Sequence, residues 1–274
     1  MKSDALYYIE AACGCHIGKV RTANEDNFYF DGKFLPVANS GTPEILTVRH
    51  PLSKPVCFGV FDGMGGEAYG EVASAIAAET LDEYCQEMME GRVTFDIDSY
   101  TQSANARICA EIEKHDNRRM GTTFALLHIQ GSNACAYNIG DSRVYLLRGN
   151  KLTQLSQDHT QARRLVDMGI LTAAEARSHS EKHKLTQHLG IFPDEIIIEP
   201  FDAAPVPVVE GDTFLLCSDG LTDMLEDKEI ETIMVRYPCP KDTVEELAKT
   251  ALLNGGKDNI TVIVVRINKG GLFE

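Results

Sequence analysis

The sequence predicts an α+β fold in which helices pack on antiparallel β-sheets. Patterns typical of strands and of helices occur in blocks, with no regular alternation along the chain. The turn signals Gly140-Asp141 and Gly149-Asn150 separate successive apolar runs, so we expect an antiparallel meander in the middle of the chain. A doubly wound parallel sheet, which needs strands that alternate with helices, fits this order less well.

Seven segments rich in β-branched and aromatic residues are expected to form strands. They are Phe28–Phe30, Val56–Phe61, Thr123–Ile129, Cys135–Ile139, Val144–Leu147, Thr213–Cys217 and Ile260–Ile267. Two long helices are expected at Ala68–Glu90 and Ser99–His115, because each has a broad apolar face with helical spacing. Two later helices should begin at Thr172 and Asp242, since each of these residues has a glutamate three positions later, as in a capping box.

The composition is that of an acidic chain with ample material for a core. Of its 274 residues 43% are hydrophobic, and 41 acidic against 26 basic side chains give a net charge of -15. This charge disfavours nucleic acid as a partner. The eight cysteines lack paired C-x-x-C spacing, as expected for reduced thiols in a cytosolic protein. Without an apolar run of transmembrane length or a signal-peptide pattern, we expect a cytoplasmic location and no membrane contact.

Residues 157–189 differ from the rest of the chain. This segment is polar and rich in histidine and basic residues, although the chain as a whole is acidic. We expect a surface excursion close to a functional site, and the alternative is a solvated helical hairpin without a role. With no internal repeat or low-complexity segment, residues 1–274 should form a single domain.

Five aspartates stand where strands and turns are expected to meet. They are Asp26, Asp62, Asp141, Asp219 and Asp258. A carboxylate that is held rigidly beside glycine and left accessible is the oxygen ligand that hard divalent cations need. Asp62, which is expected to end a strand before a glycine-rich turn, could bridge two cations about 3.5–4 Å apart. Water held between them would be partly deprotonated and would attack phosphorus, while Arg21 would bind a phosphoryl oxygen.

Two other motifs suggest different chemistry. Residues 63–68 match the G-x-G-x-x-A fingerprint of dinucleotide-binding loops, but Asp62 would place negative charge beside the pyrophosphate. Cys15 and Arg21 match the C-x5-R loop of cysteine-dependent phosphatases. That loop needs a helix that starts at the arginine, and the two carboxylates after Asn24 would raise the pKa of the thiol. A cysteine mechanism through Cys15 remains the chemical alternative.

Six segments in order resemble the motif set of the PP2C-type (PPM) metal-dependent protein phosphatases. They are Arg21-Thr-Ala-Asn-Glu-Asp26, Val60-Phe-Asp-Gly-Met-Gly-Gly66, Gly121-Thr-Thr123, Asn138-Ile-Gly-Asp-Ser-Arg143, Cys217-Ser-Asp-Gly-Leu-Thr-Asp223 and Lys257-Asp-Asn-Ile-Thr261. The resemblance implies two packed antiparallel sheets with a helix pair on each outer face, an α-β-β-α sandwich. It also implies hydrolysis of phosphoserine and phosphothreonine in proteins with Mn²⁺ or Mg²⁺.

The resemblance further implies two metal ions per chain and a possible third. Asp62 would bridge the first two ions, and the carbonyl group of Gly63 would bind the second. Asp219 and Asp258 would hold the first ion. Asp141, together with Asp219 or Asp223, resembles the weaker third metal site of bacterial members.

Other roles follow from the same resemblance. Glu25 and Asp26 would act largely through metal-bound water, and Arg21 would bind the phosphoryl group. Residues 157–189 correspond to the variable flap of the family, where substrate preference would be set. Met64 stands where animal members usually carry a histidine that is the proposed general acid, which indicates a bacterial-type enzyme with another proton donor.

Partners and alternatives complete the expectations. A phosphatase of this type would act on phosphoserine and phosphothreonine proteins, beside a cognate Ser/Thr protein kinase system, and we expect a monomer. The direct alternative is a non-catalytic phosphoprotein-binding module that keeps the fold, although unpaired carboxylates in one pocket argue against it. The stretch Gly32–Pro55 is longer than compact members need, and we expect an extended hairpin there.

Overall fold

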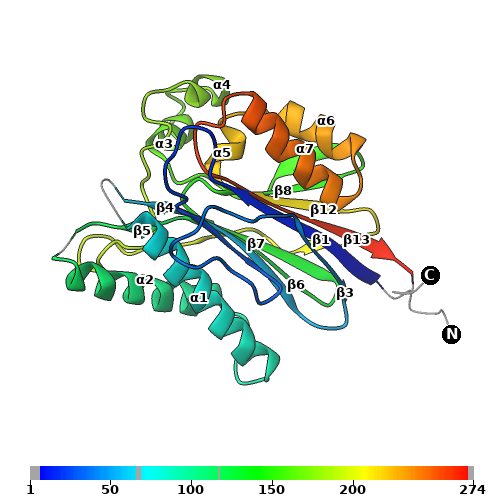
Figure 1. Ribbon diagram of the computed structural model, residues 1–274, viewed down its shortest axis with the longest axis horizontal. Coiled ribbons are helices and arrows are strands. Elements are labelled where there is room, and N and C mark those ends of the chain that lie inside the picture. Colours follow the sequence, from blue (N-terminus) through cyan, green and yellow to red (C-terminus); the bar gives the residue numbers. More distant parts are fainter. Residues whose placement is uncertain (1–6, 66–68, 117, 271–274) are drawn as a thin grey trace.

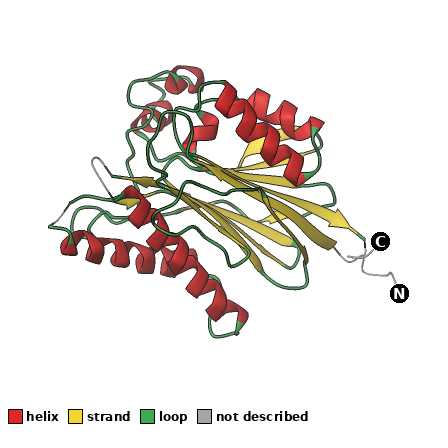
Figure 2. Cartoon of the chain, in the orientation of Figure 1, coloured by secondary structure: helices red, strands yellow, loops and turns green. Residues whose placement is uncertain are grey.

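The computed structural model describes residues 7–65, 69–116 and 118–270. Two antiparallel sheets pack face to face between helices (Figure 1), so that helix, sheet, sheet and helix form four layers. The colouring by secondary structure in Figure 2 shows the two groups of strands between the helices. The predicted α+β class and sandwich architecture are confirmed.

The first sheet has six strands, all paired antiparallel. In spatial order they are β3 (Leu46–Pro51), β1 (Tyr7–His16), β13 (Ile260–Lys269), β12 (Thr213–Cys217), β8 (Arg143–Arg148) and β9 (Lys151–Gln154). β1 and β13 are neighbours although they lie at opposite ends of the described chain.

The second sheet has seven strands, also paired antiparallel. Its main path is β10 (Phe201–Asp202), β7 (Asn133–Ile139), β6 (Phe124–Gln130), β4 (Val56–Met64) and β2 (Asp26–Phe30). Two short strands complete it, because β11 (Val206–Pro207) pairs with β7 and β5 (Gly121–Thr122) pairs with β4.

Helices cover the outer face of each sheet. α1 (Gly70–Met89) and α2 (Ile97–Lys114) pack on the second sheet. On the first sheet lie α5 (Asp219–Thr222), α6 (Asp227–Arg236) and α7 (Pro240–Leu253). Both long helices expected from the sequence are therefore present over the described residues, and the proposed first residue Ala68 lies outside them.

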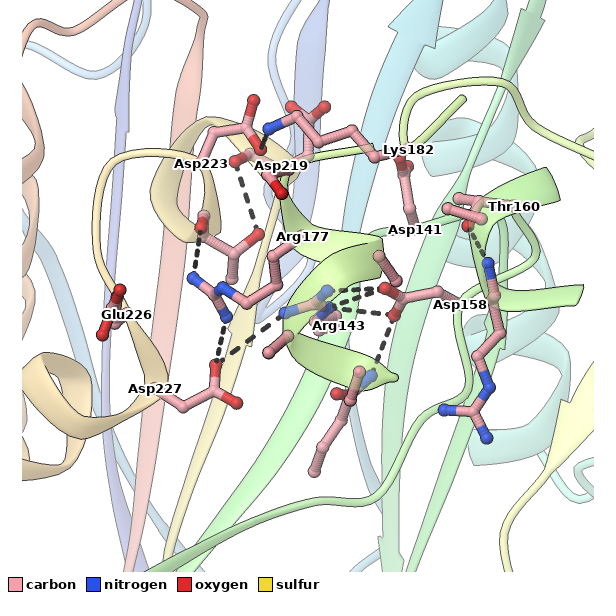
Figure 3. A pocket seen from close by; sticks show the side chains of 18 of the residues that line it. Asp141, Arg143, Asp158, Thr160, Arg177, Lys182, Asp219, Asp223, Glu226 and Asp227 are labelled. Atoms are coloured by element: carbon pink, nitrogen blue, oxygen red, sulfur yellow. Dashed lines mark hydrogen bonds and ion pairs between the residues drawn. The ribbon is translucent and has the colours of Figure 1, made fainter. Parts of the chain in front are cut away.

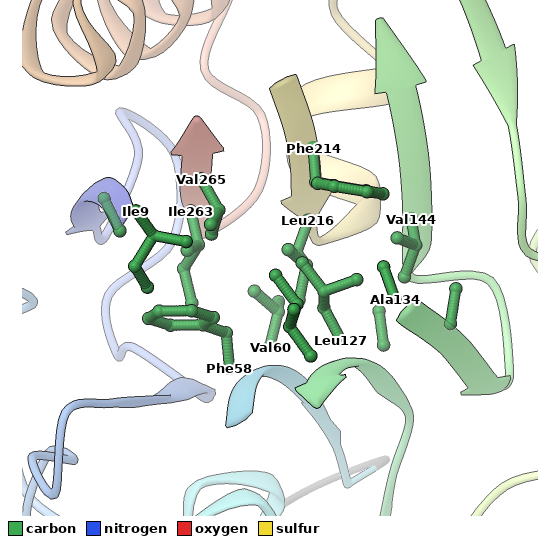
Figure 4. Close-up of a cluster of buried hydrophobic side chains, with 14 of the residues drawn as sticks. Ile9, Phe58, Val60, Leu127, Ala134, Val144, Phe214, Leu216, Ile263 and Val265 are labelled. Atoms are coloured by element: carbon green, nitrogen blue, oxygen red, sulfur yellow. The ribbon is translucent and has the colours of Figure 1, made fainter. Parts of the chain in front are cut away.

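Apolar layers hold the sandwich together. The layer between the sheets takes residues from both, among them Phe58, Val60, Leu127, Phe214 and Ile263 (Figure 4). A second cluster joins the second sheet to α1 and α2, and a third joins the first sheet to α6 and α7. Strands whose two faces both meet apolar layers are buried throughout, as β2 and β12 are.

The expected meander is interrupted. β7 lies in the second sheet and β8 in the first, so the turn at Gly140-Asp141 carries the chain from one sheet to the other and the prediction of a continuous meander is wrong. The turn at Gly149-Asn150 does close the hairpin between β8 and β9. Its two residues have φ of 56° and 62°, the left-handed values that a tight hairpin turn requires.

Two further expectations are corrected. Gly32–Pro55 is not a hairpin, because β3 pairs with β1 in the first sheet while β2 and β4 belong to the second. α7 begins at Pro240 and not at Asp242, since proline suits the first turn of a helix and extends it toward the N-terminus. The capping box at Thr172 is present and starts α4 (Ala173–Arg177) as expected.

Candidate metal centre

The five aspartates singled out in the sequence converge. Asp26 begins β2 and is the register partner of Asp62 in β4, which extends two residues further. Asp219 begins α5 two residues after the end of β12, Asp258 lies two residues before β13, and Asp141 lies two residues after β7. Burial raises the pKa of Asp62 well above its usual value, and the charges of Asp26 and of the other three raise it further. Both sheets therefore contribute carboxylates to one acidic centre.

Hydrogen bonds to and from the backbone of Asp62 fix this residue in place. The Thr123 amide and the Thr122 hydroxyl both donate to its carbonyl oxygen at 2.9 Å, and its own amide donates to Thr123 Oγ1 at 3.1 Å. Within the described ranges, no side chain or backbone group donates a hydrogen bond to its carboxylate. The carboxylate is thus held rigidly but left free to bind something else.

Asp26 is buried and already bonded on one oxygen. Its Oδ2 accepts hydrogen bonds from Ser218 Oγ at 2.8 Å and Thr261 Oγ1 at 2.7 Å. Burial raises the pKa of Asp26 to about 7, although these two hydroxyl groups oppose the shift. Ser218 precedes Asp219, and Thr261 lies three residues after Asp258. Through these two hydrogen bonds Asp26, in the second sheet, is joined to the segments that carry Asp219 and Asp258.

Arg21 reaches the acidic centre from the loop between β1 and β2. Its Nη2 lies 2.7 Å from Asp258 Oδ2, and about half of the arginine side chain, 49%, is exposed. The hydrogen bond to Asp258, together with charges that include Asp62, raises the pKa of Arg21. A guanidinium group that is permanently charged and partly exposed can bind an anion beside the carboxylates.

Close backbone approach explains the glycine after Asp62. A Cβ atom on Gly63 would overlap the carbonyl oxygens of Glu25 and Gly70. The Gly63 amide donates to the Glu25 carbonyl oxygen at 3.1 Å, and Ser74 of α1 donates to the same oxygen at 2.6 Å. Glycine therefore lets the Glu25 loop, β4 and the start of α1 pack together at the acidic centre.

A third-ion position was expected around Asp141, and a flap residue joins it. Side-chain ligand atoms of Asp141, His183 and Asp219 all lie within 4.8 Å of one another. His183 Nδ1 is 3.3 Å from Asp219 Oδ2, and its Nε2 is 3.1 Å from Asp223 Oδ2. The carboxylates of Asp219 and Asp223 raise the pKa of His183 to about 10. The sequence did not single out His183, because spacing alone does not show where a flap residue folds back.

A cavity of about 900 Å³ lies beside the acidic centre, between the flap and the α5–α6 segment (Figure 3). The flap contains α3 (Gln161–Asp167) and α4, so it is a helical hairpin as well as an excursion at the site. Arg143 of β8 binds Asp158 at the base of the flap through both Nε and Nη2. His159 accepts a hydrogen bond from the Gly140 amide at 3.2 Å.

Cys15 is unsuited to be a nucleophile. It is 4% exposed within β1, its Sγ accepts a hydrogen bond from Asn24 at 3.2 Å, and Thr261 Oγ1 lies 3.2 Å from the same sulfur. Burial and the charge of Asp26 raise the pKa of its thiol to about 12. The residues from Arg21 up to β2 form a loop and no helix, so the amide cradle of a cysteine phosphatase is not formed. The cysteine mechanism is therefore not favoured.

Divalent cations fit this donor set. Burial and the charge of Asp219 raise the pKa of Asp141, as the neighbouring charges raise that of Asp62. Salt bridges between described residues reach Asp258, Asp219 and Asp223, and none of them includes Asp62 or Asp141. Clustered carboxylate oxygens without cationic partners are the ligands that Mn²⁺ and Mg²⁺ prefer.

The fold and this centre define a four-layer sandwich protein with a carboxylate cluster suited to divalent cations. The chain matches the family model described as Protein phosphatase 2C over residues 47–252. It is 33% identical over 253 residues to the serine/threonine protein phosphatase PstP of Mycobacterium tuberculosis, an alignment that covers 91% of this chain and 43% of PstP. It is also 33% identical over 256 residues to the serine/threonine phosphatase stp of Listeria welshimeri, covering 92% and 93% of the two chains.

A solved structure is similar over nearly all of the chain. The catalytic domain of PstP in complex with two manganese ions superposes with a TM-score of 0.74 at 30% identity, covering 96% of this chain and 99% of that one. The chain belongs to the protein phosphatase 2C family. It spans less than half of the full length of PstP, as the 43% coverage shows. Among the described residues, no helix is long and apolar enough to cross a membrane.

Proposed function

We propose that this chain is a metal-dependent protein serine/threonine phosphatase. The observation that carries the proposal is the free, half-buried carboxylate of Asp62 among four other aspartates, in a chain of the protein phosphatase 2C family. Relatives in Mycobacterium tuberculosis and Listeria are named serine/threonine phosphatases. The substrates would be phosphoserine and phosphothreonine side chains of proteins.

The carboxylates would hold two divalent cations, Mn²⁺ or Mg²⁺. Asp62 would bridge them, Asp219 and Asp258 would complete the first site, and the Gly63 carbonyl group would complete the second. The bound ions would supply positive charge to the phosphoryl oxygens and lower the pKa of the attacking water. The hydrogen bonds that the Thr122 hydroxyl and the Thr123 amide donate to the Asp62 carbonyl oxygen support a bridging role for Asp62, because a bridging carboxylate must be held in a fixed position.

Other side chains would position the substrate. Arg21 can turn from Asp258 to a phosphoryl oxygen, where a guanidinium fork gives two parallel hydrogen bonds. Asp26 and Glu25 would orient water beside the ions. Met64 cannot donate a proton, so the leaving hydroxyl group must take its proton from solvent or from water in the site.

A third cation would bind beside Asp141 and Asp219. In the structure His183 and Lys182 of the flap pair with carboxylates there, so this ion would have to displace or recruit flap side chains. The flap, residues 157–189 of a single domain that we take to span 1–274, would set substrate preference because its helices line the cavity.

The cellular setting follows from the proposed chemistry. We infer a cytoplasmic monomer that opposes a cognate Ser/Thr protein kinase. A net charge of -15 favours substrates with basic residues near the phosphate, since an acidic surface repels acidic proteins.

Phosphatase assays test the proposal. Wild type should hydrolyse p-nitrophenyl phosphate and a phosphothreonine peptide with Mn²⁺, and EDTA should stop both reactions. Asp62→Asn should lose this activity, whereas Asp242→Asn, an exposed carboxylate on α7, should keep it. Cys15→Ser should remain active once it is folded.

Two results would contradict the proposal in different ways. Activity that persists in EDTA and disappears in Cys15→Ser would point to the cysteine mechanism. A folded protein without activity under any of these conditions, but with affinity for the phosphothreonine peptide, would point to a binding module.

A further inference from the structure

The flap, residues 157–189, is tied to the strands at both of its ends. Arg143 binds Asp158 at the first end. At the other end the Leu189 amide donates to the Thr122 carbonyl oxygen at 2.9 Å, and the Thr122 amide donates to that of Leu189 at 3.1 Å. Of the whole flap, only Leu189 belongs to one of the three apolar clusters that join the sheets and helices. The position of α3 and α4 against the rest of the protein therefore depends mainly on polar contacts.

Three cationic side chains make these polar contacts. Among the described residues, the hydrogen bonds and ion pairs that leave the segment 161–184 for the protein outside the flap come from Arg177, Lys182 and His183. Lys182 Nζ lies 2.9 Å from Asp223, and the two ring nitrogens of His183 lie 3.1 Å from Asp223 and 3.3 Å from Asp219. A cation bound beside Asp219 would compete with Lys182 and His183, so these two contacts depend on the state of the acidic centre.

Arg177 makes a different kind of contact, because none of its partners is a proposed metal ligand. It joins α4, on one wall of the large cavity, to the segment between α5 and α6 on the other wall (Figure 3). Its Nη2 donates to the carbonyl oxygens of Thr222 at 3.5 Å and Leu225 at 3.4 Å, and its Nη1 lies 3.5 Å from Asp227 Oδ1. Contacts of this length at a partly exposed guanidinium group are individually weak, so α4 is held at the cavity but can still move.

We propose that Arg177 is the positioning residue that holds α4 at the cavity, at the distance from the α5–α6 segment that the peptide chain of a phosphoprotein needs. This inference rests on the proposed phosphatase function. The phosphoryl group would bind at the acidic centre beside Asp219, and the residues that flank the phosphorylated side chain would extend into the cavity. Its volume of about 900 Å³ is within the usual range of ligand pockets, about 300–1,000 Å³. A small substrate without a peptide chain would not depend on Arg177.

Kinetics with two substrates and excess Mn²⁺ test this role. Arg177→Ala should raise the KM for a phosphothreonine peptide at least about fivefold without a matching loss of kcat, whereas kcat/KM for p-nitrophenyl phosphate should change less than about twofold. Arg177→Lys should recover only part of the peptide KM, because one ammonium group cannot replace the guanidinium fork. Arg164→Ala is the matched control and should behave as wild type, since Arg164 is an exposed arginine of α3 that is not among the residues lining the cavity.

Proteolysis reports on the flap without turnover. A protease that cleaves after glutamate can cut the flap at Glu175 and Glu181, which all these variants keep. Cleavage there should be at least about threefold faster in Arg177→Ala than in wild type and Arg164→Ala.

Three results would overturn the proposal. They are unchanged cleavage in Arg177→Ala, equal changes of the peptide KM in Arg177→Ala and Arg164→Ala, and equal losses of Arg177→Ala on both substrates, which would mean that Arg177 acts through the acidic centre. Failure of the proposed phosphatase function is distinguishable, because it would appear in wild type as no Mn²⁺-dependent hydrolysis of p-nitrophenyl phosphate.

Discussion

Replacing Asp158 with alanine should lower the free energy of unfolding by about 3 kcal/mol. Arg143 donates to this carboxylate from Nε at 2.9 and 3.1 Å and from Nη2 at 2.6 Å. Both side chains are only 17% exposed, so the truncation leaves a buried guanidinium group without its main partner. Breaking a buried pair costs about 3–5 kcal/mol. We expect the lower end, because Tyr145 and Asp227 stay within 2.9 and 3.8 Å of Arg143.

Urea unfolding at neutral pH measures this loss, with Asp167→Ala as the matched control. Asp167 pairs with Arg163 on the exposed side of the flap, where each side chain is more than 40% exposed. Such surface pairs contribute about 0–1 kcal/mol. If Asp158→Ala costs no more than Asp167→Ala, the reasoning that Arg143 depends on a desolvated partner is wrong.

Three further outcomes follow from the structure. Asp62→Asn should raise the thermal stability of the metal-free protein yet remove the stabilisation by Mn²⁺, because ionising Asp62 is costly without a cation. Melting curves should show a higher melting temperature than wild type in EDTA and no increase on adding Mn²⁺, and the absence of either effect would refute this. Gly220→Ala should weaken Mn²⁺ binding, since its Cβ would overlap the Asn259 carbonyl oxygen and push Asp219 away; unchanged calorimetric affinity would count against it. Burial lowers the pKa of His128 from 6.5 to about 4. The unfolded chain therefore binds a proton here at a higher pH than the folded protein does, and the folded protein loses stability as pH falls below 6.5. The free energy of unfolding of His128→Leu, compared with that of wild type, should therefore rise by about 2 kcal/mol when the pH is lowered from about 7.5 to about 5. Urea unfolding measures this difference, and a difference that does not change with pH would contradict the prediction.

Much of the fold could be predicted because local patterns and packing agree. The strands Thr213–Cys217 and Val56–Phe61 are apolar on both faces, and each is sandwiched between apolar layers. β1 escaped prediction because its small residues, from Ala11 to Cys15, have no strong strand preference. It is a strand because β3 and β13 pair with it on both sides, and tertiary context of this kind overrides propensity.

The acidic centre was predictable in its members but not in its surroundings. Aspartates at expected junctions of strands and turns were visible in the sequence, and the structure brings all five together. The pairings of His183 with Asp219 and of Arg143 with Asp158 were not, because they are set by how the flap folds back. The turn at Gly140 likewise shows that a chain reverses direction, but not which sheet the next strand joins.

The pairing of β1 with β13 also fixes when the centre can exist. Arg21 and Asp258 are 237 residues apart, and Asp26 and Thr261 are 235 apart, so the contacts between them join the two ends of the described chain. At a synthesis rate of about 5–20 residues per second, the first of these side chains waits roughly 10–50 s for its partner. On a growing chain the acidic centre would therefore stay incomplete until β13 has been made and inserted between β1 and β12.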